Sequence, residues 1–271
     1  MISSRTYVTR RLQKVLLLTL GLVLGIFATR AAQAKGTLVF QSIMDGLERR
    51  NFVFKASKTS LPTRIHAFRI NPEKYAFRVV QPTNASTSTA HRLAREHNLL
   101  LAVNASFFDP AGKPLGLLID QGHKTQGLRS VDWGVFSVSS TGKVAVNHTR
   151  EFQPLNPVEA AFQAGPRLVV DGRPLKLKPQ FGRRTALCVD TAEHVIVVVT
   201  ESGILLADLA EVMARSPGDG GLGCVDAMNL DGGSSTQATL LHPNHPWDLI
   251  GGANVPVVLG IQPRITRSSH D

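Results

Sequence analysis

Val225-Asp226-Ala227-Met228-Asn229-Leu230 is a largely apolar stretch that runs directly into Asp231-Gly232-Gly233-Ser234-Ser235. We predict a buried strand over 225–230 that presents the carboxylate of Asp231 at its end. Gly232 and Gly233 let backbone N–H groups approach a ligand closely and form an anion-binding nest, and the hydroxyls of Ser234 and Ser235 add donors. The alternative is a tight turn in which Asp231 caps its own backbone. The segment is neither a Walker phosphate loop nor a serine-hydrolase elbow, because it lacks Gly-Lys-Ser/Thr and Gly-x-Ser-x-Gly.

Short strands dominate the chain on the N-terminal side of this stretch. Alternating or continuous apolar residues predict strands at 64–70, 75–80, 99–103, 185–189 and 195–200. Asn71-Pro72 separates the first two and predicts a hairpin. A second hairpin is expected across the turn 190–194, and it would place Arg184 near Thr200 and Glu201.

Two segments follow a helical pattern instead. Residues 88–98 combine charged side chains with Leu93, and residues 204–214 carry regularly spaced apolar residues before the glycine-rich segment 218–223. The first of these helices leads into the buried strand 99–103, an order that favours strands and helices in one layered core. The sequence therefore predicts an α+β fold, a single domain with a mixed β-sheet core and a few inserted helices.

Asn104-Ala105-Ser106-Phe107-Phe108 follows the predicted strand 99–103. An amide at a strand end can hold sugar hydroxyls, and an aromatic ring can form an apolar wall for the face of a sugar. Asn104 and Phe107 are therefore candidate substrate-binding residues. The alternative for each phenylalanine is a place in the core.

Two arginines follow short turn segments, Arg167 in Gly165-Pro166-Arg167 and Arg184 in Arg183-Arg184-Thr185. A guanidinium group matches the geometry of phosphate because it donates two parallel hydrogen bonds. We therefore predict Arg167 and Arg184 as phosphate ligands. The alternative is a solvated basic face.

The first 34 residues have the order of a secretory signal peptide. Arg5, Arg10, Arg11 and Lys14 precede the 13-residue apolar run Val15–Phe27, and Ala32-Gln33-Ala34 is a small-x-small cleavage pattern. A retained membrane anchor is the alternative, although a span needs roughly 20 apolar residues. Without the leader, 25 basic and 20 acidic residues remain, so that the formal charge of +10 falls to +5. This mild excess favours anionic ligands, and no nucleic-acid motif accompanies it.

Cys188 and Cys224 are the two cysteines of the chain. Export implies an oxidising compartment, in which a pair is usually bridged. We therefore predict a disulfide between them, with two separate buried thiols as the alternative.

Five segments, in this order, resemble the phosphodiester glycosidase family. They are Asn104–Phe108, Pro114–Leu117, Gln163–Val169 with Asp171-Gly172, Arg184–Ala186 and Asn229–Ser235. The sequence departs from the family at four positions where the family commonly has glycine. These positions are Ala105, Ser106, Cys188 and Ser234.

The resemblance implies a hydrolase that cleaves between the anomeric carbon of a sugar and a phosphate oxygen. We therefore take Asp231 as the catalytic carboxylate and keep Glu201 as a reserve, because the predicted hairpin places it near Arg184. Arg184 and Arg167 would bind the phosphate with the 232–233 amides, Ser234 and Ser235, and Asn104 would hold sugar hydroxyls. No cofactor is predicted. Asp231 with Asp190 or Glu201 could hold a divalent ion, but no ligand cluster indicates a metal site.

The resulting domain plan divides the chain into four parts. We predict a signal peptide at 1–34, N-terminal strands at 35–59, the phosphodiester glycosidase-like domain at 60–262 and a polar tail at 263–271. The expected partner is a phosphorylated sugar or glycan, without nucleic acid and without a membrane span after signal cleavage. We expect an exported protein, periplasmic or secreted. The alternative function is a non-catalytic envelope protein that binds anionic or phosphorylated glycans.

Overall fold

The computed structural model describes residues 39–56, 61–83 and 86–264. These belong to the compact unit that begins at Leu38. The predicted signal peptide and most of the predicted polar tail lie outside the described residues. Within the described ranges, no helix combines the length and the apolar character that crossing a bilayer requires.

The strand β15 (Val195–Thr200) shows how the sequence builds the core. All six of its side chains are buried, and successive side chains of a strand point to opposite faces of the sheet. Val195, Val197 and Val199 accordingly join one core cluster. Ile196 and Val198 join another on the opposite face, together with α3 (Leu206–Ala214).

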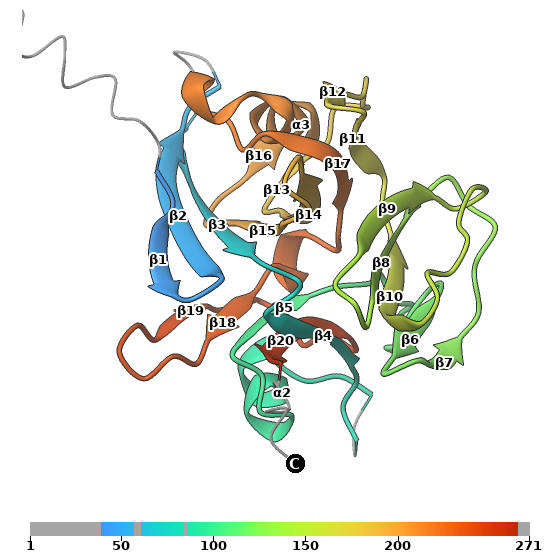
Figure 1. The fold of residues 1–271 in the computed structure, drawn as a ribbon. Helices are drawn as coiled ribbons and strands as arrows, with labels where there is room; N and C mark the ends of the chain where they lie inside the picture. Colours follow the sequence, from blue (N-terminus) through green and yellow to red (C-terminus); the bar gives the residue numbers. More distant parts are fainter. Residues whose placement is uncertain (1–38, 57–60, 84–85, 265–271) are drawn as a thin grey trace, which may run out of the picture. The chain divides into compact units, whose positions relative to one another are not determined.

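β15 lies inside an eight-stranded sheet in which every neighbouring pair is antiparallel. One face of this sheet contributes to the large central core, and α3 packs on the other face (Figure 1). Its strands, in spatial order, are β1 (Gln41–Met44), β2 (Leu47–Phe54), β3 (Thr63–Ile70), β15, β14 (Thr185–Asp190), β17 (Cys224–Asn229), β11 (Arg167–Val170) and β12 (Arg173–Pro174).

Two five-stranded antiparallel sheets complete the central core, which takes buried side chains from all three sheets. The first has the order β19 (Trp247–Leu249), β18 (Ala238–Leu240), β5 (Leu101–Asn104), β20 (Val258–Pro263) and β4 (Tyr75–Val80). The second has the order β7 (His123–Gln126), β6 (Leu118–Asp120), β10 (Val158–Ala164), β8 (Gly134–Ser139) and β9 (Val144–His148). A separate two-stranded ribbon pairs β13 (Phe181–Gly182) with β16 (Ile204–Leu205).

The predicted α+β class with a mixed sheet core is wrong, because the described residues form mostly antiparallel β-structure. They contain two α-helices, α2 (Ala90–Glu96) and α3, of seven and nine residues. Both helices occur where the sequence predicts them, but each covers one face of a sheet. The helix before β5 does not make a parallel crossover, since β5 pairs antiparallel with β18 and with β20.

One predicted hairpin forms and the other does not. β14 and β15 pair across the turn 190–194, and the N–H of Thr200 donates to the carbonyl of Arg184 over 2.9 Å. By contrast, β3 pairs with β2 and β15, whereas β4 pairs with β20 in another sheet. The turn at Asn71-Pro72 therefore carries the chain from one sheet to the next.

Candidate active site

The register of two neighbouring strands brings the candidate acid and a candidate arginine together. Ala186 of β14 lies opposite Asn229 of β17, and the N–H of Leu230 donates to the carbonyl of Thr185 over 2.8 Å. Continuing this antiparallel register by one more residue places Arg184 opposite Asp231. The two residues therefore lie at the same end of the eight-stranded sheet.

Both glycines after Asp231 are required by the local geometry. A Cβ atom on Gly232 would lie 2.8 Å from the carbonyl oxygen of Arg183, and Gly233 has a φ of +63°. The N–H of Gly232 donates to Asp231 Oδ1 over 2.9 Å, and the N–H of Gly233 donates to the carbonyl of Arg183 over 2.9 Å. The turn thus packs closely against the start of β14.

Asn104 lies beneath this turn and is fully buried. Its Nδ2 donates to the backbone oxygen of Asp231 over 2.6 Å. Its Oδ1 accepts from the hydroxyl of Thr185 over 2.7 Å and from the N–H of Gln237 over 3.1 Å. Asn104 therefore ties β5, β14 and the Asp231 turn together.

Arg184 is only 8% exposed, and none of the described carboxylates forms an ion pair with it. One of its terminal nitrogens donates to the carbonyl of Gln180 over 2.5 Å, and its Nε is buried without a partner in the described structure. Burial lowers the pKa of Arg184. A buried guanidinium with unused donors is suited to bind an anion.

Asp231 and Arg184 line one cleft of about 610 Å³. This volume lies within the usual range for sites that bind small ligands. The lining residues are Phe107, Leu115, Trp133, Gly165, Pro166, Gln180, Phe181, Gly182, Arg184, Asn229, Asp231, Gly232 and Gly233.

The environment of Asp231 favours its neutral form. Burial raises the pKa of its carboxyl, and hydrogen bonds from the Ser235 side chain and the Gly232 backbone lower that pKa to a smaller extent. Arg184 is not among the groups that shift the pKa of Asp231. A carboxylate with a raised pKa is a stronger proton acceptor than an ordinary aspartate.

An aromatic pair forms another part of the cleft wall. The rings of Phe107 and Trp133 have centroids 4.9 Å apart and are tilted by 52°, and both side chains are half-buried. Trp133 is a lining residue that the sequence analysis missed. It lies directly before the first residue of β8, whereas Asn104 is the last residue of β5.

Asn229 is a second lining residue that the sequence analysis did not select, although it lies two positions before Asp231. Its Nδ2 donates to the carbonyls of Gly165 and Leu230, while its Oδ1 is buried without a partner among the described atoms. Gln180 and Phe181 were also missed, because Gln180 precedes and Phe181 begins the two-residue strand β13, which is too short to show a periodic pattern.

Other candidates lie outside the cleft lining. Arg167 is half-buried, and the Cγ of its side chain approaches Gly134 of β8. Ser234 is exposed, whereas Ser235 is buried behind Asp231.

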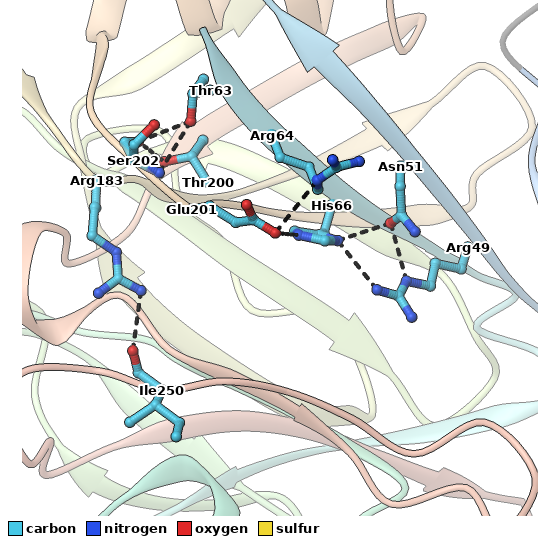
Figure 2. Close-up of polar contacts among 10 residues, drawn as sticks. All are labelled: Arg49, Asn51, Thr63, Arg64, His66, Arg183, Thr200, Glu201, Ser202 and Ile250. Carbon is cyan, nitrogen blue, oxygen red and sulfur yellow. Dashed lines mark hydrogen bonds and ion pairs between the residues drawn. The ribbon is translucent and has the colours of Figure 1, made fainter. Parts of the chain in front are cut away.

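Glu201 also lies outside the lining, although it follows Thr200 at the Arg184 end of the hairpin. Figure 2 shows it in a separate polar network. Its Oε1 lies 2.8 Å from His66 Nε2 and 3.6 Å from Arg64 Nε. The carboxylate therefore has partners of its own.

Cys188 of β14 and Cys224 of β17 are joined by a buried disulfide. It lies on the α3 face of the sheet. In the part of the chain that the structure describes, no group of three or more His, Cys, Asp or Glu side chains is placed to hold a metal ion.

Comparison with known proteins bears directly on the resemblance. The phosphodiester glycosidase family matches residues 97–262, more than half of the chain. A search of curated proteins found no match.

Two solved structures are similar in fold. One is a hypothetical protein from Synechocystis, with a TM-score of 0.67 and 17% identity over 83% of this chain and 63% of that one. The other is the catalytic domain of zebrafish N-acetylglucosamine-1-phosphodiester alpha-N-acetylglucosaminidase, described as auto-inhibited by its pro-peptide. It has a TM-score of 0.66 and 18% identity over 83% of this chain and 86% of that one. At these identities the structures show a shared fold, and the family match over 97–262 confirms the resemblance seen in the motifs: the chain belongs to the phosphodiester glycosidase family.

Proposed function

We propose that this protein hydrolyses the bond between the anomeric carbon of a sugar and the oxygen of a phosphodiester, releasing the sugar and a phosphomonoester. The observation that carries the proposal is that a half-buried carboxylate, Asp231, and a buried arginine, Arg184, line one cleft without forming an ion pair in the described structure. A ligand with a sugar carbon next to a phosphate would occupy the space between such groups.

The leaving group explains why a single carboxylate in the cleft is sufficient. Glycosidases ordinarily use two carboxyl groups, because a poor alkoxide leaving group must be protonated. A phosphate is far more acidic and needs its negative charge held instead. Arg184 supplies positive charge and donors for this purpose. The N–H groups of Gly232 and Gly233, which the sequence suggested as phosphate ligands, instead donate to Asp231 Oδ1 and to the carbonyl of Arg183.

In the proposed step, Asp231 acts as the general base. It takes a proton from a water molecule, the water oxygen bonds to the anomeric carbon, and the bond from that carbon to the phosphate oxygen breaks. The electron pair leaves with the phosphate, which Arg184 holds. The raised pKa of Asp231 suits this proton transfer.

The remaining residues support this arrangement. The rings of Phe107 and Trp133 offer an apolar wall for the sugar ring. Asn104 is proposed as a positioning residue that holds the backbone of Asp231, rather than as a direct ligand. Glu201 and Arg167 have no role in this step.

We further propose that the protein is exported, with cleavage after Ala34. The leader pattern described above supports this proposal, and N-terminal sequencing of the protein recovered from its producing cell tests it. A mature chain that begins at Lys35 is expected. A chain that keeps its leader would contradict cleavage.

The reaction is tested with the methyl diester of N-acetylglucosamine 1-phosphate, chosen because the zebrafish relative is named for that group. We expect free reducing sugar and methyl phosphate. Sugar 1-phosphate plus methanol would instead identify a phosphodiesterase, and tight binding without turnover would identify a glycan-binding protein. Asp231→Asn is expected to lower kcat by about 10²–10⁴-fold; near-normal turnover would refute the assignment.

A further inference from the structure

A second cavity lies next to the candidate active site and is apolar. Its volume is about 430 Å³, and Asp208 is the one charged residue among the described residues that line it. The lining residues are Phe54, Ala56, Leu61, Thr63, Phe181, Gly203, Ile204, Leu205 and Asp208. We call this cavity the apolar groove.

Exposed apolar side chains gather at the apolar groove. Leu61 is 86% exposed, Phe181 is 73% exposed and Leu205 is 38% exposed. They are three of the eight large apolar side chains that are exposed among the described residues. Single exposed apolar residues are ordinary, but several around one cavity mark a binding surface.

Phe181 lies at the boundary between the apolar groove and the catalytic cleft, because it lines both. Its ring packs against the backbone of Gly203, where an added Cβ would lie only 2.3 Å from a ring carbon. The pairing of Phe181 with Leu205 and of Gly182 with Ile204 holds the backbone of Phe181 at this boundary.

The same short segment also reaches the proposed phosphate ligand. The carbonyl of Gln180, directly before Phe181, accepts a hydrogen bond from Arg184. A phosphate held at Arg184 would therefore lie close to the boundary that Phe181 forms. A substituent leaving that phosphate, away from Phe107 and Trp133, would pass over Phe181.

We propose that the apolar groove binds an aliphatic chain carried by the phosphate of the substrate, so that the preferred substrate is a glycosyl phosphodiester of a long-chain alcohol. This inference rests on the proposed function and names its substrate class. The sugar occupies the aromatic side of the cleft, Arg184 holds the phosphate, and the chain runs over Phe181 toward Leu61 and Leu205. A polar substituent would leave these side chains in water.

The test compares methyl, butyl and octyl diesters of the same sugar 1-phosphate, all below their micelle concentrations. Complete burial of a methylene group is worth about 0.8 kcal/mol, or roughly fourfold in kcat/KM. The open groove buries each group only in part, so we expect kcat/KM to rise at least about tenfold from methyl to octyl. Equal values for the three diesters would overturn the inference and leave the proposed function standing.

Failure of the proposed function gives a different result. If none of the diesters is cleaved, the proposed reaction is refuted. Calorimetry then compares the affinities for octyl phosphate and methyl phosphate, which tests the apolar groove independently of turnover. At least tenfold tighter binding of octyl phosphate supports an aliphatic chain in the groove. Equal affinities for octyl phosphate and methyl phosphate overturn the inference. A structure in which another part of the chain or a second copy fills the groove overturns it too.

Variants of the groove residues test whether these side chains cause the preference for the octyl diester. Leu61→Ser and Leu205→Ser change side chains that line the groove but not the cleft. They should reduce the preference for octyl over methyl to less than threefold, with the methyl diester cleaved as before. Leu128→Ser is the matched control, because Leu128 is 45% exposed and lines neither cavity. A preference that survives both groove variants would contradict the proposal.

Discussion

Asp231 is stabilised in its neutral form by burial, and this has a consequence for folding. A raised pKa means that the folded protein holds this proton more tightly than the unfolded chain does. Stability is therefore lost as the pH rises from the ordinary Asp pKa through the raised one. We expect Asp231→Asn to melt at a higher temperature than the wild type at pH 7, with the difference disappearing near pH 3.

Asp226→Asn provides the control for this measurement. Burial also raises the pKa of Asp226, which lies outside the cleft. It should show the same direction of stabilisation while turnover stays within about twofold. A lower melting temperature for Asp231→Asn at pH 7 would contradict the assigned environment.

The same raised pKa sets the acidic limb of the activity profile. As the proposed general base, Asp231 must be deprotonated, so kcat/KM should increase with pH through a midpoint above the ordinary Asp value of about 3.9. Initial rates between pH 3 and 8 measure this limb. A midpoint at or below about 3.9 would disagree with a half-buried carboxyl of raised pKa in this role.

Arg184 is expected to be far more sensitive to substitution than Arg167. Arg184→Lys keeps the charge but loses the planar pair of donors, and a charge-assisted hydrogen bond contributes about 1.5–3 kcal/mol. We expect kcat/KM to fall about 10–100-fold, mostly through KM. Arg167→Lys should change it less than threefold, because Arg167 lies outside the cleft lining; equal losses would place both arginines on the phosphate.

At the scale of elements, the turn after β17 depends on two glycines for different reasons. Gly233→Ala meets no atom within 4 Å but keeps a left-handed φ of +63°, which costs about 1–2 kcal/mol. Gly232→Ala adds a Cβ that would lie 2.8 Å from the Arg183 carbonyl, so the turn itself must shift. We expect Gly232→Ala to lose most activity and Gly233→Ala to lose stability first, as measured by kcat and chemical unfolding.

At the scale of the whole molecule, the disulfide closes a long loop that contains α3. The sequence separation of Cys188 and Cys224 is 36 residues, for which the chain-entropy estimate is about 3–4 kcal/mol. We expect the double variant Cys188→Ala/Cys224→Ala to lose most of that free energy of unfolding while keeping its activity at low temperature. Since both sulfurs are buried, reductant should weaken the wild type only when denaturant is also present.

The sequence alone determined the local elements. Val195–Thr200 is predicted and observed as a strand, since its continuous apolar run fills cores on both faces of a sheet. The helix at 204–214 and the hairpin that ends at Arg184 also follow from short-range patterns. These features depend on residues a few positions apart, whose spacing is visible in the chain.

Tertiary structure alone decided which strands pair and what gathers around Asp231. Periodicity shows that a strand is buried but not which strand lies beside it. The hairpin predicted for 64–70 with 75–80 therefore failed, and the sheets proved antiparallel rather than mixed. Phe181 reached the cleft through its pairing with Leu205, 24 positions along the chain, and Trp133 through its place directly before β8; neither placement is visible in a local pattern.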